Sequence, residues 1–221
     1  MIYDMVRKDI RVVDIGTDHG YLLSKLILDN KCTYGIGTDI SYECLKKAQI
    51  TIKKYHLTDK INILQSDGLN NINEDEVDDI VISGMGSELI VKIIDNCSWS
   101  KKINNKHFIL QPMNKPWILR EYLFNNQFQI IKEDITYSKN LFYVCITAKF
   151  LKKIFIKNKL DKFIGILPHN QNEYTKKYFF YLSRKFYKIA KRLPNEDSYH
   201  EKYNYYTNLY PEILDIANSL K

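Results

Sequence analysis

Between residues 11 and 111, short apolar runs rich in β-branched residues alternate with longer segments in which apolar residues recur at helical spacing. Such alternation favours an α/β fold, in which a parallel sheet is covered by helices on both faces. Ligands of these sheets bind outside the carboxyl ends of the strands. The predicted strands are Val12–Ile15, Tyr34–Ile40, Ile61–Gln65, Ile80–Ser83 and Phe108–Gln111, and the predicted helices are Tyr21–Asn30, Tyr42–Tyr55, Ser87–Asn96 and Pro116–Asn125.

After Asn125 the pattern changes. Two segments with alternating apolar and polar residues, Gln127–Ile135 and Leu141–Phe150, are separated by a predicted turn at 136–140. This arrangement is typical of an antiparallel pair that closes a sheet. We therefore assign residues 1–150 to a sheet domain and residues 151–221 to a second domain.

The second domain is predicted to be a helical hairpin. Glu173–Leu193 and Tyr203–Leu220 both have helical spacing and are joined by a connector that begins at Pro194. Pro211, inside the second helix, predicts a kink or a restart there, because proline lacks an N–H and its ring clashes with the preceding turn.

Net charge separates the same two parts. Residues 1–150 hold 19 Lys+Arg and 19 Asp+Glu, whereas residues 151–221 hold 14 and 7, so the whole +7 excess lies in the last 71 residues. A neutral body with a basic tail indicates a polyanionic partner, with nucleic acid as the first candidate and an anionic membrane as the second. On a helical wheel, basic residues lie opposite an apolar stripe in the first hairpin helix, and a solvated face over a core stripe is the structural alternative. The basic residues are Lys177, Arg184, Lys185, Lys188, Lys191 and Arg192.

Cysteine usage and the N-terminal segment exclude other classes of protein. The four cysteines are too widely spaced for a metal-ligand knuckle or a dense disulfide framework, so we expect a reducing, cytoplasmic setting and no bound metal. Charged residues interrupt the first ten positions, where a signal peptide would be apolar, and no run is long enough to span a membrane. Because nucleic acid is preferred to a membrane surface as the partner of the basic tail, we expect no association with a membrane.

The loop after the first predicted strand reads Asp-Ile-Gly-Thr-Asp-His-Gly over residues 14–20. Gly16 and Gly20 let the backbone approach a ligand closely, and Asp39, at the end of the second strand, can accept both hydroxyls of a ribose. These features indicate a nucleoside-containing cofactor. The spacing is not the GxGxxG of dinucleotide enzymes, and Asp18 would oppose a pyrophosphate at the helix N-terminus. A cofactor without phosphates is therefore favoured, and the cationic S-adenosylmethionine is the obvious one.

Two further strand ends carry acidic and small residues. In Ser-Asp-Gly-Leu, 66–69, Asp67 can hydrogen-bond an adenine amino group while the next backbone N–H addresses the ring. In Ser-Gly-Met-Gly-Ser, 83–87, small residues leave space beside a methyl group, and Met85 can pack on an adenosine. Each motif alone is weak evidence, and Asp-Gly is a common turn pair, but motifs at four successive strand ends favour a bound cofactor.

Several of these motifs also carry a family resemblance. They are DIGTDHGYL at 14–22, SDGL at 66–69, ISGMGSELI at 82–90, LQP at 110–112 and LREYL at 119–123. With them the sequence resembles the bacterial tRNA adenine-22 N1-methyltransferases. It departs from that family at Leu23, where proline is usual, at Ser87, where glycine is usual, and in a start shorter than the family's N-terminal helix.

The resemblance implies a Rossmann-like methyltransferase domain over 1–150, with a mostly parallel sheet and an antiparallel closing strand. It implies a coiled-coil-like, tRNA-binding hairpin over 151–221. The reaction it implies is methyl transfer from S-adenosylmethionine to N1 of an adenine in the D-loop region of tRNA. The predicted cofactor-binding residues are Asp14, Gly16, Thr17, Asp18, His19, Gly20, Tyr21, Asp39, Ile40, Asp67, Gly68, Gly84, Met85 and Gly86.

Adenine N1 already presents a lone pair, so alignment with the methyl group can supply much of the acceleration and no strong general base is needed. We place Asp18 and His19 near the reacting centre, and Gln111 and Asn114 at the adenine edge. A purely structural role for His19, packing against or capping the first helix, stays open. The basic residues of the first hairpin helix, Arg184, Lys185, Lys188, Lys191 and Arg192, are predicted to hold the tRNA phosphates.

Three other functions stay open. The chain could be a non-catalytic RNA-binding protein with this fold, or a methyltransferase for another RNA or a small molecule, although the basic tail disfavours a small substrate. A nucleotide-dependent oxidoreductase is disfavoured by Asp18 and by the lack of a second phosphate cradle. We expect a monomer or weak homodimer.

Overall fold

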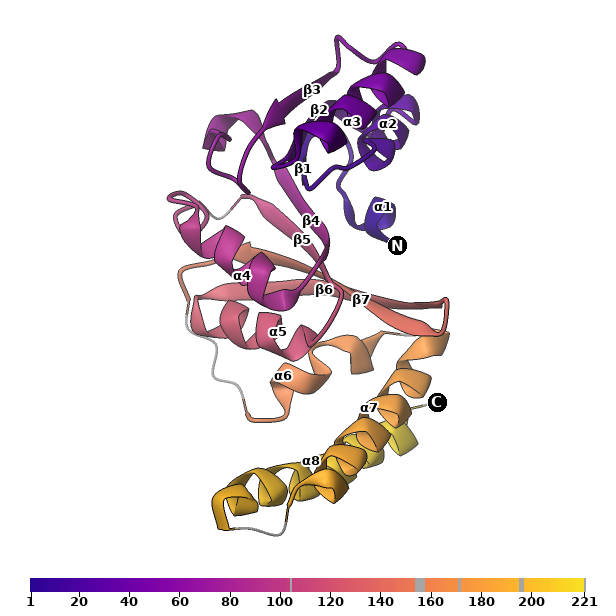
Figure 1. Ribbon diagram of the computed structural model, residues 1–221, viewed down its shortest axis with the longest axis vertical. Coiled ribbons are helices and arrows are strands. Elements are labelled where there is room, and N and C mark those ends of the chain that lie inside the picture. Colours follow the sequence, from indigo (N-terminus) through magenta and orange to yellow (C-terminus); the bar gives the residue numbers. More distant parts are fainter. Residues whose placement is uncertain (104, 154–157, 171, 195–196, 221) are drawn as a thin grey trace.

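The computed structural model describes residues 1–103, 105–153, 158–170, 172–194 and 197–220. Its centre is a seven-stranded sheet with the order β3-β2-β1-β4-β5-β7-β6 (Figure 1). The strands are β1 Ile10–Ile15, β2 Cys32–Asp39, β3 Ile61–Gln65, β4 Asp79–Met85, β5 His107–Pro112, β6 Phe128–Ser138 and β7 Leu141–Phe150. The α-helices are α1 Ile2–Met5, α2 Tyr21–Leu28, α3 Tyr42–Lys54, α4 Ser87–Asn96, α5 Pro116–Asn125, α6 Asp161–Ile164, α7 Glu173–Arg192 and α8 His200–Ser219, and the 3-10 helices are η1 Glu74–Glu76, η2 Leu167–His169 and η3 Asp197–Tyr199.

Strands β1 to β5 are parallel, and β7 pairs antiparallel with both β5 and β6. The predicted parallel sheet with an antiparallel closing pair is therefore confirmed. The predicted turn at 136–140 is too long, because β6 continues to Ser138 and only Lys139 and Asn140 form the turn. Both turn residues have positive φ, 48° and 61°, which matches the right-handed twist of the flanking strands.

Helices cover both faces of the sheet. Successive side chains of a strand point to opposite faces, and in the buried strands the residues on both faces are apolar. Val12 of β1 contributes to the apolar cluster formed with α2 and α3, whereas its neighbour Val13 contributes to the cluster formed with α4 and α5. Both side chains are fully buried. The double covering leaves the strand ends and their loops as the accessible part of the parallel sheet.

The two C-terminal helices form the predicted hairpin and lie side by side at the end of the molecule far from α1 (Figure 1). Ser183 of α7 donates a hydrogen bond of 2.8 Å to the backbone carbonyl of Tyr210 in α8. The restart predicted at Pro211 is wrong, since α8 runs unbroken from His200 to Ser219 with the proline inside it. Packing of its buried face on α7 compensates for the backbone hydrogen bond that proline cannot make.

The hairpin and the sheet share one apolar core. Phe179, Leu182 and Phe186 of α7 belong to the same buried cluster as Phe108 of β5 and Leu119 of α5. Strand β7 ends at Phe150, where we placed the end of the first domain. The division into two domains stays a prediction, and its two parts do not have separate cores.

A buried ion pair holds the segment that connects the sheet to the hairpin. Arg120 and Glu133 are both fully buried, and the Arg120 Nε donates to the Glu133 carboxylate over 2.7 Å. Arg120 also donates to the carbonyl of Phe163 in α6, over 2.9 Å, and Glu133 accepts from the backbone N–H of Ile166, over 2.6 Å. Gly165, which lies between Phe163 and Ile166 in the chain, has φ 59° and leaves no room for a Cβ, which would collide with the Glu133 carboxylate.

In the described residues, no helix combines the length and apolarity needed to cross a membrane. The same residues contain no group of three or more His, Cys, Asp or Glu side chains placed to hold a metal ion.

Candidate active site

The loop after β1 is held by backbone hydrogen bonds to β2. The N–H groups of Gly16 and Thr17 both donate to the carbonyl of Thr38, each over 2.8 Å. Gly16 and Gly20 have φ of 75° and 69°, and Asp18 has φ 45°. The loop therefore takes a fixed shape that positive φ values make possible. Gly20 has a packing role as well, because a Cβ there would lie 3.3 Å from the Ala48 side chain of α3.

Asp14 is the buried acid of this loop. Its carboxylate accepts a hydrogen bond of 3.0 Å from the Thr17 hydroxyl, and its side chain lies near Asp39. Burial raises the pKa of Asp14 to about 7; the Thr17 hydrogen bond opposes that shift, and the Asp39 charge adds to it. A cationic ligand beside Asp14 would stabilise its ionised form.

At the end of β2, an acidic and an apolar side chain stand together. The Asp39 carboxylate accepts one hydrogen bond of 2.9 Å from the N–H of Ser41, which fixes its orientation. The adjacent Ile40 is 68% exposed, an unusual position for a large aliphatic side chain. One hydrogen-bonding carboxylate beside an exposed apolar surface suits a ribose joined to a planar base.

The loop after β3 combines an exposed acid with a buried turn. Asp67 lies at the surface, whereas Gly68, with φ 60°, and Leu69 are buried. The Ser66 hydroxyl donates to the carbonyl of Gly68 over 3.0 Å and accepts from the N–H of Asn71 over 3.2 Å. The turn is therefore rigid while the Asp67 side chain is left accessible to a ligand.

The loop after β4 touches the loop after β1. A Cβ on Gly16 would lie 2.5 Å from the Met85 methyl group, so the Met85 side chain covers Gly16. Gly84, with φ 78°, faces open space, since a Cβ there would meet no atom within 4 Å. The space beside Gly84 is therefore open, while the Met85 side chain packs on the neighbouring loop.

The predicted adenine-contacting residues have different environments. Gln111 is buried, and its side-chain oxygen accepts from the Ser83 hydroxyl and the Gly84 N–H, both over 3.1 Å. Its amide donates to the carbonyl of Pro112 over 2.9 Å. Gln111 therefore fixes the Gly84 loop. Asn114 is exposed, and its side-chain amide lies 3.8 Å from the position of a Cβ on Gly86.

Asp18 and His19 lie at the mouth of the first loop. The His19 Nε2 is 3.6 Å from the Asp18 carboxylate, and both side chains are substantially exposed. The His19 ring stacks on Tyr21, with centroids 5.2 Å apart and an interplanar angle of 4°. Tyr21 is itself 64% exposed, so this stacked pair presents an aromatic surface next to the loop.

Ser87 is a residue whose contribution sequence reasoning missed. Its buried hydroxyl donates to the carbonyls of Asn114, over 2.7 Å, and Lys115, over 3.0 Å. It therefore ties the start of α4 to the loop after β5, which carries Asn114. The departure from the usual glycine at this position was the available signal, but only the folded chain shows which carbonyls lie near.

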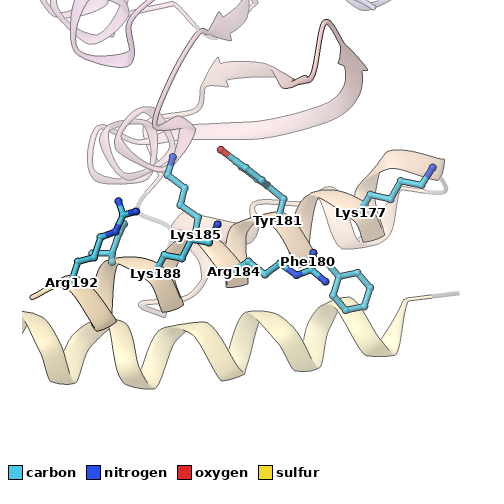
Figure 2. Close-up of a pocket in the computed structure, with 8 residues that line it drawn as sticks. Lys177, Phe180, Tyr181, Arg184, Lys185, Lys188 and Arg192 are labelled. Carbon is cyan, nitrogen blue, oxygen red and sulfur yellow. The ribbon is translucent and has the colours of Figure 1, made fainter.

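The basic residues of α7 do not all share one surface. A groove of about 830 Å³ runs along the helix (Figure 2). Four of the five predicted tRNA-binding residues line it: Arg184, Lys185, Lys188 and Arg192. Lys191 lies outside, with its ammonium 4.9 Å from the Tyr187 ring centre. Lys177, which the helical wheel also placed on this face, joins the groove.

Lys185 differs from its neighbours. Its side chain is half-buried and points with Tyr181 from α7 toward the body (Figure 2). Both residues also line a smaller cavity of about 170 Å³ between α7 and the body. Sequence reasoning missed this cavity, because its walls come from segments far apart in the chain.

The fold is a Rossmann-like α/β fold, and the predicted cofactor-binding motifs lie at the carboxyl edge of its sheet. Residues 1–146 match the family described as "Methyltransferase domain", and the chain belongs to this family.

Two sequence relatives are tRNA methyltransferases by name. The chain is 31% identical over 138 residues to the tRNA (adenine(22)-N(1))-methyltransferase of Bacillus subtilis, covering 62% of this chain and 58% of the relative. It is 33% identical over 158 residues to the putative tRNA methyltransferase MG248 of Mycoplasma genitalium, covering 71% of this chain and 68% of the relative. The matched region is thus less than two thirds of the Bacillus protein. The family resemblance seen in the motifs is confirmed.

Solved structures support the fold over the full chain. The crystal structure of the B. subtilis m1A22 tRNA methyltransferase TrmK superposes with a TM-score of 0.85 and 24% identity, covering 97% of this chain and 96% of that one. M. capricolum TrmK, solved with S-adenosylhomocysteine, gives a TM-score of 0.83 and 24% identity, covering 100% and 96%. The likeness extends through the α7–α8 hairpin, so the predicted fold class is confirmed.

Proposed function

We propose that this chain is an S-adenosylmethionine-dependent tRNA methyltransferase that modifies N1 of adenine 22, and that it acts in the cytoplasm. The observation that carries the proposal is the open space beside Gly84, which lies at the same edge of the sheet as Asp14, Asp39 and the exposed Ile40. The names of the Bacillus and Mycoplasma relatives supply the reaction and the substrate.

The residues present fit the cofactor. Asp39 is oriented for ribose hydroxyls, Ile40 offers an apolar surface for the adenine, and Asp67 is accessible for its amino group. Asp14 supplies a buried carboxylate that a cation would stabilise. When bound, S-adenosylmethionine supplies an activated methyl group on a positively charged sulfur. The other predicted cofactor contacts, from Gly16 to Tyr21, Gly68 and Met85, stay part of this proposal.

The chain's own contribution to the reaction is positioning and charge. Gln111 holds the Gly84 loop through two hydrogen bonds, so the space for the methyl group keeps its shape. Asn114 lies beside Gly86 and is available to the adenine edge. Asp18 and His19 lie at the loop mouth, and the Asp18 carboxylate favours the positive charge that the methylated base acquires.

The α7 groove is the proposed tRNA surface. Folded RNA is recognised largely through phosphates and shape. The exposed cations Arg184, Lys188 and Arg192 line a single groove, and we propose that the phosphate backbone lies along it. Lys191, on the neighbouring surface, would contact a phosphate outside the groove.

The direct test is incubation of the protein with unmodified tRNA transcript and labelled S-adenosylmethionine, followed by nucleoside mass spectrometry. We expect 1-methyladenosine, and we expect none from a transcript in which adenine 22 is replaced by guanine. Methylation of that control transcript would contradict the assigned position. Cofactor and tRNA binding without any methylated nucleoside would instead support a non-catalytic RNA-binding protein.

A further inference from the structure

The small cavity between α7 and the body is formed by three separate segments. They are the loop and helix start at 112–117, the β6–β7 hairpin at 137–144, and α7 at 178–185. The cavity has a volume of about 170 Å³. It lies beside the proposed methyl-transfer position, because the Met113 N–H donates to the carbonyl of Met85 over 2.8 Å and the Asn114 amide approaches Gly86.

Aromatic rings from all three segments form its walls. The Phe142 ring lies 5.4 Å from Tyr181 and 5.6 Å from Tyr178, measured between centroids. Trp117 contributes from α5, and its ring packs against Phe163 of α6 and Phe186 of α7, with centroid distances of 5.8 and 5.6 Å. Tyr181 stays 46% exposed although Tyr178, one turn earlier, is buried. The cavity therefore offers ring surface that the packing of the hairpin does not use.

The cavity is also lined by a cationic side chain, Lys185. The Lys185 ammonium lies 5.3 Å from the Trp117 ring centre and 5.9 Å from the Tyr181 ring centre. Burial, together with the nearby Lys115 ammonium, lowers the pKa of Lys185. Lys115 has a carboxylate partner in Glu88, at 3.1 Å, but in the described part of the chain no carboxylate pairs with Lys185. A half-buried ammonium without an acid is a site for an anionic group.

We propose that this cavity receives one unstacked nucleotide of the tRNA, with its base against Tyr181 and Trp117 and its phosphate on Lys185. The inference rests on the proposed function. Aromatic rings combined with a cation match the two chemical parts of a nucleotide, and a base must leave its stack before its N1 atom can react. The volume is below the roughly 300–1,000 Å³ of pockets for drug-sized ligands, which suits a single base.

Trp117 makes the proposal directly observable. The other tryptophan, Trp99, is buried and donates to the Ile72 carbonyl over 3.0 Å, so a Trp99→Phe variant isolates the Trp117 signal. We expect unmodified tRNA transcript to quench the fluorescence of that variant. Transcripts with 2-aminopurine at the target adenine or at one flanking nucleotide then identify which base stacks. Unchanged Trp117 emission at saturating tRNA would overturn the proposal.

Variants of the two contacting side chains test the binding energy. Tyr181→Ala should raise the Kd for tRNA by about 5- to 100-fold, whereas Tyr181→Phe, which keeps the ring, should stay within about twofold of wild type. The matched control is Tyr203→Ala, which removes a similarly exposed tyrosine, 45%, from α8. If Tyr181→Ala fails to fold, the Trp117 measurement still decides.

Lys185→Gln should lower the slope of log Kd against log salt concentration by about 0.7–0.9, as expected for one lost phosphate contact. Lys202→Gln, on α8, is its control. Methylation by the wild-type protein separates the two hypotheses. If wild type produces no 1-methyladenosine, the proposed function fails; if it does while Tyr181→Ala and Lys185→Gln behave like their controls, only the cavity assignment fails.

Discussion

The carboxyl edge of the sheet and helix α7 hold their chemistry in different ways. At the sheet edge, backbone shape is fixed: Gly16, Asp18 and Gly84 have φ of 75°, 45° and 78°. On α7, exposed Arg and Lys side chains project from a regular helix. A small cofactor requires a backbone of defined shape, whereas a polyanion requires charge density with little geometric demand.

The two hairpin helices differ just as sharply. Helix α7 carries seven Lys+Arg and one Glu among its 20 residues, whereas α8 carries one Lys and three Asp+Glu. Both have a buried face within the shared core. The basic surface therefore belongs to α7 alone, and α8 packs against α7.

The largest expected effect concerns the connection between the two regions. Arg120→Ala should lower the free energy of unfolding by about 3–5 kcal/mol, because it leaves the Glu133 carboxylate buried without its partner. Urea unfolding measures the loss. The double variant Arg120→Met/Glu133→Leu should lose less, because neither charge is then buried alone. Equal losses in the two variants would show that packing, rather than charge, fastens the hairpin.

Asp14 predicts a pH dependence. Its pKa is about 7 in the folded chain and about 3.9 when unfolded. Between these values the unfolded chain has released the proton that the folded chain still holds, so the free energy of unfolding falls as pH rises from about 4 to 7. Asp14→Asn cannot ionise and therefore removes this fall, which amounts to about 2–4 kcal/mol at most. Its melting temperature relative to wild type should therefore be higher at pH 8 than at pH 4.5.

The same titration should appear in cofactor binding. Because the ionised Asp14 favours a cation, the affinity of wild type for S-adenosylmethionine should rise with pH up to about 7 and then level off. Calorimetry across this range gives the profile. A flat profile would place the cationic part of the cofactor away from Asp14.

Asp39→Ala should weaken S-adenosylmethionine binding by about 1.5–3 kcal/mol, the value of charge-assisted hydrogen bonds. Calorimetry measures this change, and the Kd for tRNA should be unaffected. An unchanged dissociation constant for the cofactor would refute the ribose assignment of Asp39.

The smallest expected effect, per residue, is on the basic groove. Lys188→Gln and Arg192→Gln should each raise the Kd for tRNA about 3- to 10-fold and flatten its salt dependence. Cofactor affinity should stay constant. Substitutions are better than truncation after Phe150, which would also expose apolar side chains from the shared core, such as Phe108. Loss of cofactor binding in these variants would contradict the assignment of cofactor binding to the sheet edge and tRNA binding to α7.

Much of the fold was readable from local patterns. The repeated alternation of strands such as Val12–Ile15 with helices predicted the parallel sheet. The two segments after Asn125, in which apolar and polar residues alternate, predicted the closing hairpin. The restart considered at Pro211 does not occur, because packing along α8 outweighs the local preference of proline. The turn at Lys139 and Asn140 was set too long, since Thr136 and Tyr137 still pair with β7.

The predicted roles of individual site residues stay predictions, but the structure shows the environment of each one, including contacts between distant segments. The sequence marked Gly84 as a small residue beside a ligand, and the structure leaves space there. The substrate role of Gln111 stays a prediction, and the folded chain adds that this side chain is bonded to the Gly84 loop. The sequence grouped Lys185 with Lys191, although the two side chains lie on different surfaces.

The sequence by itself determined the order of strands and helices, the cofactor motifs and the concentration of charge near the C-terminus, because each is encoded by residues close together in the chain. The tertiary structure decided which basic side chains share a groove, and it brought Trp117, Phe142 and Tyr181 around one cavity. It also paired Arg120 with Glu133 in the interior. These arrangements depend on the packing of distant segments against each other, which periodicity and spacing along a chain do not specify.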